Sequence, residues 1–366
     1  MQHKICLILT NNLHGLYGFR KEVIHAILET GVEVYISAPE DKETFVYFKK
    51  IGCKIVITNI DRRGINPLKD LKLLFHYVRL LRCIKPSFVL GYTIKPNIYG
   101  GLACRLCHIT FLPNVTGLGS AVENPGFLQS ITTFLYKISF KKAYTVFFQN
   151  EENQKFCISK RLISCPSVLL PGSGVNLQYH TFKKYPESSG RISFIFIGRI
   201  MKEKGIEEYL EMAQRIKEKY KNVDFHILGA YEEKYAEKLR DFKKSGIVIY
   251  HGSTCDVRPF IEKTWCTILP SYHEGMSNVL LESCAAGRPI ITTDRCGCRE
   301  TVNPGVNGYV VPYKNVDELT KAVEDFINLP YSEKKMMGEA SRQKVEKEFD
   351  RNIVISSYLK VISSIQ

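Results

Sequence analysis

The sequence lacks long apolar runs, leader-like segments, internal repeats and low-complexity tracts. No stretch of about 18 consecutive apolar residues occurs, so we expect no segment that crosses a bilayer. The apolar run at residues 5–9 is too short for the core of a secretory signal, and no cleavage site follows it, so it is interpreted as a strand. These absences predict a packed globular chain whose contact with any membrane is peripheral.

The sequence also lacks cysteine and histidine residues at the spacing of a metal site. The 12 cysteines are scattered, and most stand among apolar residues, as expected of small buried side chains in a reducing compartment. The segment Cys104 to His108 fits the CxxCH haem-attachment pattern, but it lies within an apolar, helix-like run, and we interpret the match as coincidence. Cys296 and Cys298 are separated by one residue, and no second ligand pair stands at zinc-finger spacing. We therefore expect no metal site.

The chain has 366 residues, which at about 150 residues per domain is enough for two domains. Residues 1–189 hold 24 basic against 12 acidic side chains, whereas residues 190–366 hold 27 against 25. This asymmetry fits an anionic partner for the first half, and it fits equally a basic surface with no special function. Nucleic acid is not the expected partner, because no helix-turn-helix, RNP-type aromatic motif or zinc finger occurs.

Short β-branched runs alternate with longer amphipathic segments along the chain. The expected strands of the first half are 5–9, 32–36, 55–57, 88–90, 109–112 and 146–148, with helices at 19–30, 67–84, 95–107 and 127–141. The expected strands of the second half are 192–197, 223–228, 247–250, 267–269, 290–292 and 309–311. Helices are expected there at 204–219, 231–244 and 278–286, followed by 315–328, 332–348 and 350–364. This order predicts two doubly wound α/β domains with parallel sheets.

The polar, turn-rich stretch 183–190 marks the expected domain boundary. We expect an N-terminal domain over residues 1–185, a C-terminal domain over 186–349, and a helix over 350–366 that packs back on the N-terminal domain. Two such domains place the carboxyl ends of both sheets on opposite sides of one cleft, where open α/β sheets bind ligands. The expected function is therefore that of an enzyme with a cleft.

The strongest motif runs from Leu269 to Glu282 and reads as strand, loop and helix. Pro270 ends the strand, and Ser277 or Asn278 can cap the helix. A helix N-terminus at the carboxyl end of a sheet offers free N–H groups to an anion such as phosphate. Glu274 and Glu282 bracket that N-terminus, and carboxylates accept hydrogen bonds from sugar hydroxyls. For either glutamate alone, an ordinary charged loop or a solvated helix face explains the residue as well.

A second motif, Phe194 to Gly205, also leaves a strand and enters a helix. Gly198 permits close approach, and Arg199 and Lys204 can converge on a diphosphate and neutralise charge that develops as a bond breaks. The alternative is a basic loop on a basic protein. The position favours the functional interpretation, because both strand ends open on the same edge.

These residues resemble the retaining glycosyltransferases of family 4. The run Glu274 to Glu282 is similar to the family's E-x7-E element, and Gly198-Arg199 with Lys204-Gly205 is similar to its G-R-x4-K-G loop. The segments 294–300 and 307–312 fit the family's following segments in order and spacing. The resemblance implies a GT-B fold, two Rossmann-like domains facing across a cleft, with a nucleotide-sugar donor as substrate and no cofactor or essential metal.

The resemblance also assigns roles. Arg199 and Lys204 are the residues implied to hold the donor diphosphate, and Glu274 to meet the sugar hydroxyls. Glu282 is implied to accept from the ribose. Further donor contacts are implied for Gly275, Met276, Ser277, Asn278 and Gly15, the last in the glycine-containing loop expected at 11–18 after the first strand.

One departure concerns the acceptor side. Many family members carry a histidine after a strand of the N-terminal domain. The corresponding stretch here is 111–120, and it contains no histidine. The segment instead resembles members that build bacterial surface or N-linked glycans on polyprenyl diphosphate. Because no side chain is an obvious nucleophile, the family implies a front-face mechanism in which a donor phosphate oxygen takes the acceptor proton.

A polyprenyl-diphosphate-linked acceptor must be met at a bilayer. The helix-like segments 67–84 and 127–142 mix apolar residues with Lys and Arg, a composition suited to an anionic membrane surface, although core-packed helices with solvated lysines share it. We therefore expect a cytoplasmic protein that binds peripherally to the inner face of the cytoplasmic membrane.

Two other functions stay open. A nucleotide-sugar 2-epimerase also uses the GT-B fold, but it needs acid and base residues at the sugar ring, and the pair Glu274 and Glu282 points away from it. A catalytically silent nucleotide-sugar-binding subunit of a partner transferase is the third hypothesis. Intact Arg199 and Lys204 argue against that subunit.

Overall fold

The structure of the protein is a computed structural model that describes residues 4–61, 64, 66–118, 126–188 and 190–365. The chain forms two compact units. The first comprises the residues up to Ser173 together with those from Asn352 onward, and the second comprises Gly174–Arg351. Within the described ranges, no helix has the length and apolar character needed to cross a membrane.

The first unit is built on a seven-stranded parallel sheet in the order β3-β2-β1-β4-β5-β6-β7. Its strands are β1 (Ile5–Leu9), β2 (Glu33–Ala38), β3 (Lys54–Ile57), β4 (Phe88–Tyr92), β5 (Thr110–Val115), β6 (Val146–Phe148) and β7 (Ser167–Leu169). Its helices are α1 (Leu13–Glu29), α2 (Lys42–Lys50), α3 (Pro67–Ile84), the π-helix η1 (Pro96–Gly100), α4 (Gly101–Cys107), α6 (Phe127–Phe140), α7 (Glu151–Ser159) and α14 (Arg351–Ser363).

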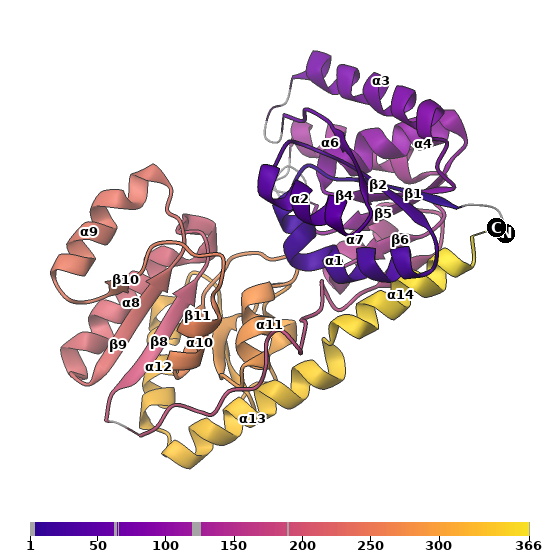
Figure 1. The fold of residues 1–366 in the computed structure, drawn as a ribbon. Helices are drawn as coiled ribbons and strands as arrows, with labels where there is room; N and C mark the ends of the chain where they lie inside the picture. The colour runs from indigo at the N-terminus through magenta and orange to yellow at the C-terminus, as the bar shows by residue number, and fades with distance from the viewer. Residues whose placement is uncertain (1–3, 62–63, 65, 119–125, 189, 366) are drawn as a thin grey trace. The chain divides into compact units, whose positions relative to one another are not determined.

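Helices cover both faces of this sheet. One hydrophobic cluster joins the strands to α1, α2 and α14, and a second joins them to α3, α4, α6 and α7. In Figure 1, α3, α4 and α6 lie on one side of the sheet and α1 and α14 on the other. Tyr358 of α14 is fully buried, and its ring centroid lies 4.4 Å from that of Phe147 in β6. The C-terminal helix is therefore part of the first unit's core.

The second unit has a six-stranded parallel sheet in the order β10-β9-β8-β11-β12-β13. Its strands are β8 (Ile192–Ile197), β9 (Val223–Leu228), β10 (Ile249–Tyr250), β11 (Cys266–Leu269), β12 (Ile290–Thr293) and β13 (Gly308–Val311). Its helices are η2 (Lys202–Lys204), α8 (Ile206–Lys219), η3 (Glu233–Tyr235), α9 (Ala236–Lys244), α10 (Arg258–Lys263), α11 (Asn278–Ala285), η4 (Arg299–Thr301), α12 (Val316–Asn328) and α13 (Tyr331–Glu348).

Central strands of this sheet are apolar on both faces, as a doubly covered parallel sheet requires. In β8, Phe194 and Phe196 join one hydrophobic cluster while Ile195 and Ile197 join another. The predicted pair of doubly wound α/β domains is thus confirmed.

Several helices and one strand were not expected from the sequence: α2, α7, α10 and β7. Helix α2 carried a readable signal, because Asp41 caps it by accepting a hydrogen bond from the Thr44 amide at 3.2 Å. Helix α1 begins at Leu13 and not near residue 19, because Asn12 caps it by accepting from the Gly15 amide at 3.1 Å. Gly15 therefore lies within a helix, where the sequence analysis placed it in a loop.

The division between the units falls between Ser173 and Gly174, whereas the sequence analysis placed it after residue 185. The intervening segment packs on the second unit, since Tyr185 is buried in its core and donates a hydrogen bond to the Trp265 carbonyl at 2.9 Å. Cysteines flanked by apolar residues were expected to be buried. Cys6 and Cys266 are buried, whereas Cys83 is exposed on α3.

Candidate active site

Three loops at the carboxyl edge of the second unit's sheet form the candidate site. They follow β8, β11 and β12, which are neighbours in the sheet. The first loop carries Arg199 and η2 and ends at Gly205, whose φ is +73°. A Cβ at Gly205 would stand 2.0 Å from the Pro270 carbonyl oxygen, so only glycine allows the first loop to pack against the second.

The second loop brings Glu274 to the first. The Lys204 ammonium forms an ion pair with the Glu274 carboxylate, and the two side chains are only 20% and 14% exposed. The Tyr272 amide donates to the Glu203 carbonyl at 2.9 Å, which fixes the two loops beside the pair. The two motifs recognised separately in the sequence therefore meet through a charged contact.

The third loop supports Glu274 from the other side. Its Gly297 has φ +77°, and a Cβ there would stand 2.5 Å from the Glu274 carbonyl oxygen. The Ser277 amide donates to the Gly297 carbonyl at 2.8 Å, and the Glu274 amide donates to the Cys296 carbonyl at 3.2 Å. The backbone on both sides of Gly275 is thus fixed by the neighbouring loop.

Helix α11 begins directly after this loop and has no side-chain cap. Ser277 occupies the N-cap position but makes no capping hydrogen bond with its side chain. The Asn278 side-chain oxygen is buried and has no hydrogen-bond partner among the described residues. The Met276 side chain is 7% exposed and belongs to the core, so only its backbone can face a ligand. The first turn of α11 therefore keeps unsatisfied backbone donors.

Glu282 lies in the second turn of α11, in a different environment. It lines a cavity of about 190 Å³ together with Tyr179, His180, Asp256 and Arg258, a cavity whose lining does not include Glu274. His180 Nε2 lies 3.9 Å from Glu282 Oε1. Burial raises the pKa of Glu282 to about 7; the Asp256 charge adds to this rise and Arg351 opposes it. The carboxyl group therefore changes charge near neutral pH.

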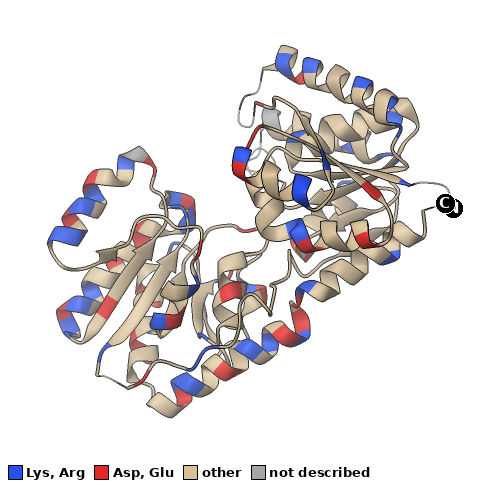
Figure 2. Ribbon diagram, in the orientation of Figure 1, with Lys and Arg blue, Asp and Glu red and all other residues tan. Residues whose placement is uncertain are grey.

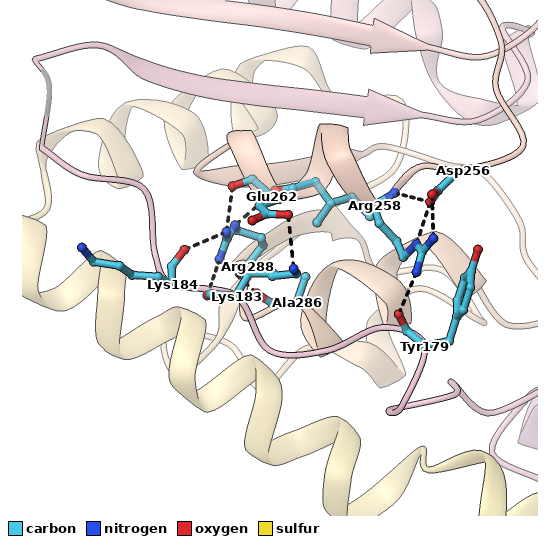
Figure 3. Close-up of polar contacts among 9 residues, drawn as sticks. Tyr179, Lys183, Lys184, Asp256, Arg258, Glu262, Ala286 and Arg288 are labelled. Carbon is cyan, nitrogen blue, oxygen red and sulfur yellow. Dashed lines mark hydrogen bonds and ion pairs between the residues drawn. The ribbon is translucent and has the colours of Figure 1, made fainter.

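Hydrogen bonds and a cation–π contact connect residues in the wall of this cavity (Figure 3). The Arg258 guanidinium donates to both carboxylate oxygens of Asp256, at 2.8 and 2.7 Å, and its centre lies 3.7 Å from the Tyr179 ring centroid. It also donates to the Tyr179 carbonyl at 3.4 Å. This stack fixes an aromatic ring and a planar cation in the lining of the cavity.

Arg288, also drawn in Figure 3, is a residue that the sequence analysis did not single out. Its side chain is fully buried, and within the described part of the chain its acceptors are all backbone carbonyls. The acceptors are Ile261, Glu262, Lys183, Lys184, Ala286 and Gly287, at 2.8–3.2 Å. Burial lowers the pKa of Arg288 to about 10, which leaves it charged at neutral pH. Arg288 thereby joins the ends of α10 and α11 to the segment that precedes β8.

The structure brings together some of the predicted site residues and separates others. Lys204 and Glu274 are in contact, and Gly275 to Asn278 continue from them into α11. Arg199 is exposed on the same loop as Lys204, and the structure gives it no charged partner among the residues it describes. Glu282 lines the separate cavity. Gly15 belongs to the first unit.

The described part of the chain contains no group of three or more His, Cys, Asp or Glu side chains arranged to hold a metal ion. Of the stretch 111–120, in which the sequence has no histidine, residues 119 and 120 lie outside the described residues.

Comparison with known proteins places two family models on the chain. A model described as glycosyl transferases group 1 matches residues 179–344, and one described as glycosyl transferase 4-like matches residues 4–150. A relative from Campylobacter jejuni is 28% identical over 364 residues, covering 95% of each chain. It is the N,N'-diacetylbacillosaminyl-diphospho-undecaprenol α-1,3-N-acetylgalactosaminyltransferase, a lipid-linked glycan enzyme of the kind that the sequence resemblance indicated.

The capsular polysaccharide biosynthesis glycosyltransferase CapM of Staphylococcus aureus is 26% identical, with 90% of each chain covered. Among solved structures, HepE of Anabaena in complex with UDP and glucose superposes with a TM-score of 0.77 at 14% identity, over 99% of this chain and 100% of the other. A glycosyltransferase from Rickettsia africae gives a TM-score of 0.80 at 16% identity, with 100% and 99% covered. At these identities the two structures show a shared fold.

Proposed function

Since the chain belongs to the family 4-like glycosyltransferases of the GT-B fold, we propose that it transfers a hexose or N-acetylhexosamine from a UDP-linked donor, with retention, to a saccharide on polyprenyl diphosphate. This reaction serves the biosynthesis of a bacterial surface polysaccharide or glycan. The observation that carries the proposal is the contact between Lys204 and Glu274 beside the uncapped start of α11.

The donor diphosphate binds at the start of α11. Unsatisfied backbone N–H groups and the positive end of the helix dipole attract an anion there. Lys204 is held nearby by Glu274, and Arg199 is exposed on the same loop. An incoming diphosphate shares the Lys204 ammonium with Glu274, because the ammonium has three N–H donors and can serve both.

The sugar and the nucleoside occupy either side of the diphosphate. Glu274 accepts from sugar hydroxyls, and the fixed backbone of Gly275 and Met276 donates toward the same group. Asn278 offers a buried oxygen without a partner to a hydroxyl donor. Glu282 accepts from the ribose hydroxyls, and its cavity, with the Tyr179 and Arg258 stack in its lining, takes the nucleoside.

Transfer then proceeds on the front face of the sugar. The acceptor hydroxyl oxygen forms a bond to the anomeric carbon while the bond from that carbon to the donor phosphate oxygen breaks. The acceptor proton passes to an oxygen of the departing diphosphate, so no protein nucleophile is needed. Lys204 and Arg199 stabilise the negative charge that develops on the leaving group.

The names of two relatives support the proposed acceptor and its location. The Campylobacter jejuni enzyme carries a lipid diphosphate acceptor in its name, and CapM acts in capsule biosynthesis. A polyprenyl-diphosphate acceptor requires the enzyme to work at a membrane surface, which we assign to the inner face of the cytoplasmic membrane. The N-terminal unit, with its excess of basic residues, is the part proposed to contact that anionic surface.

The proposal is tested by incubating the purified chain with a panel of UDP-sugars and bacterial membrane lipid extract. Lys204→Ala and Glu274→Ala are compared with Lys202→Ala, an exposed residue of the same short helix. We expect the wild type and Lys202→Ala to move sugar into lipid, and the two site variants to lose about 100-fold or more in kcat, as removal of a transition-state contact does.

Other outcomes separate the alternatives. Consumption of a UDP-sugar without any lipid product contradicts transfer and favours the epimerase or a hydrolase. Binding of a UDP-sugar with no turnover, even when candidate acceptors are supplied, favours the silent subunit. Equal activity in Lys204→Ala and Lys202→Ala contradicts the assigned diphosphate site.

A further inference from the structure

One face of the first unit is covered by α3, α4 and α6, all of which cross from the carboxyl edge of the sheet to its amino edge. Each lies between two parallel strands that follow one another along the chain: α3 between β3 and β4, α4 between β4 and β5, and α6 between β5 and β6. Each helix therefore begins near the carboxyl ends of the strands and runs antiparallel to them. Their inner sides fill the hydrophobic cluster with residues such as Tyr77 and Phe140. Their outer sides are open to solvent.

The solvent-facing side of α3 carries large apolar side chains in its first half, where a surface helix usually carries polar ones. Leu68, Leu71 and Phe75 are 71%, 48% and 64% exposed. Their spacing of three and four residues places them on one stripe of the helix. A single exposed leucine is unremarkable, but three large apolar side chains on one outward stripe point to a surface that is covered in use.

Helix α6 repeats this pattern. Ile131 and Phe134 are 40% and 60% exposed and are separated by three residues. Helix α4, which contacts both α3 and α6, adds Leu106 with 61% exposure near its end. The apolar side chains of α3 lie in its first half, toward the carboxyl edge of the sheet, and those of α6 lie near its middle.

Basic residues continue the same stripes toward the amino edge. On α3, Arg79 and Arg82 follow Phe75 on the exposed side, and on α6 and just after it Lys137, Lys141 and Lys142 are exposed. Figure 2 shows Lys and Arg along α3 with one acidic position near its beginning. That position is Asp70, the single acidic residue within the sequences of α3, α4 and α6.

Asp70 does not offset this positive charge at the surface. Its carboxylate turns inward, where it accepts from the Lys95 ammonium at 2.6 Å and from the Tyr99 hydroxyl at 2.9 Å. The Asp70 and Lys95 side chains are only 15% and 13% exposed. The exposed side of these helices is therefore apolar and basic, without acidic side chains among their residues.

We propose that the outer side of α3 and α6 binds an anionic lipid bilayer, with the apolar side chains in the headgroup and acyl boundary and the basic ones on the headgroups. Charge complementarity selects this occupant, because lysine and arginine beside large apolar residues are the composition of interfacial helices. The choice of a membrane rests on the proposed lipid-linked acceptor. The inference goes further by assigning the contact to exposed side chains of α3 and α6.

The test is co-sedimentation of the full chain with vesicles of phosphatidylcholine alone or mixed with phosphatidylglycerol, with no glycan acceptor present. We expect binding to the mixed vesicles that weakens with added salt. Leu71→Ser with Phe75→Ser should weaken it about tenfold or more, since each side chain loses its apolar burial. Arg79→Glu with Arg82→Glu should weaken it about tenfold and reduce its dependence on salt.

Helix α2, on the opposite face of the same sheet, supplies matched controls. Val46 is 69% exposed, and Lys49 and Lys50 are exposed in its last turn. Val46→Ser and Lys49→Glu with Lys50→Glu should leave vesicle binding within about twofold of the wild type. Far-UV circular dichroism and melting temperature verify that every variant is folded.

Two results would overturn the inference. The first is equal loss of binding in the α2 and α3 variants, which indicates a nonspecific charge effect. The second is no vesicle binding at all by the wild type. If, in addition, Leu71→Ser with Phe75→Ser changes the sedimentation mass, the apolar side chains of α3 serve self-association or a protein partner and not a membrane. Because no acceptor is present, these results do not depend on whether the chain transfers sugar.

Discussion

At the scale of single residues, the burial of Glu282 makes both stability and donor binding depend on pH. Its pKa of about 7 in the folded chain stands above the ordinary glutamate value of 4.5. The folded state therefore binds more protons than the unfolded chain between about pH 4.5 and pH 7, and stability falls as pH rises through that window. Above it, the buried charge is fully present and the loss is complete.

The prediction compares the wild type with Glu282→Gln. From pH 5 to pH 8 the wild type should lose about 1–3 kcal/mol of unfolding free energy more than the variant, measured by urea denaturation at each pH. UDP-glucose, whose diphosphate charge is constant over this range, should bind the wild type more tightly at pH 8 than at pH 6, because the ionised carboxylate accepts from ribose. A pH dependence identical in both proteins contradicts the assignment.

A second prediction at this scale concerns Gly205. Gly205→Ala places a Cβ against the Pro270 carbonyl and strains a φ of +73°, so it should separate the two site loops and lower stability by about 2 kcal/mol or more. Gly246 has the same φ but open space around it, and Gly246→Ala should cost about 1 kcal/mol. Thermal denaturation compares them; equal losses would mean that the close approach contributes nothing.

At the scale of elements, Arg288 joins α10 and α11 to the segment before β8. Arg288→Met keeps much of the side-chain volume but leaves several buried carbonyls without donors, so we expect about 3 kcal/mol or more of destabilisation. Arg215→Met, which removes surface ion pairs with Glu211 and Asp317, should cost less than about 1 kcal/mol. Chemical denaturation of both variants checks this, and similar losses would show that the buried carbonyls find water instead.

The elements show which structural features a sequence reveals. Long amphipathic patterns such as 67–84 and apolar strands such as Ile192–Ile197 were predicted with their bounds, because buried faces impose a periodicity. Helix α7 was missed, since it is nine residues long and has two buried positions. Its cap, Asn150 accepting from the Asn153 amide at 2.8 Å, was the available signal.

At the site, the sequence reveals motifs but not contacts between distant residues. Lys204 and Glu274 were identified from separate motifs, and their ion pair depends on β8 and β11 being neighbours. The role of Arg288 could not be predicted, because its carbonyl acceptors come from three separate segments. The raised pKa of Glu282 depends on burial in a folded cavity, which no local pattern records.

At the scale of the whole molecule, the chain combines two parallel-sheet units with different roles. The family resemblance inferred from the motifs is confirmed by family models over both units and by the Campylobacter jejuni relative. The donor site proposed here lies within the second unit, and the proposed membrane surface lies within the first. The C-terminal residues from Asn352 return to the first unit, so the chain crosses between the units twice.

The most direct test of the central claim is the structure of the reaction product. The purified chain is incubated with a UDP-α-sugar that it consumes and a synthetic polyprenyl-diphosphate saccharide, and the lipid product is analysed by mass spectrometry and proton NMR. The account predicts one added sugar on the lipid-linked saccharide, joined through an α linkage. A β linkage would contradict retention, and release of free sugar or an epimerised nucleotide sugar with no extended lipid would contradict the transferase itself.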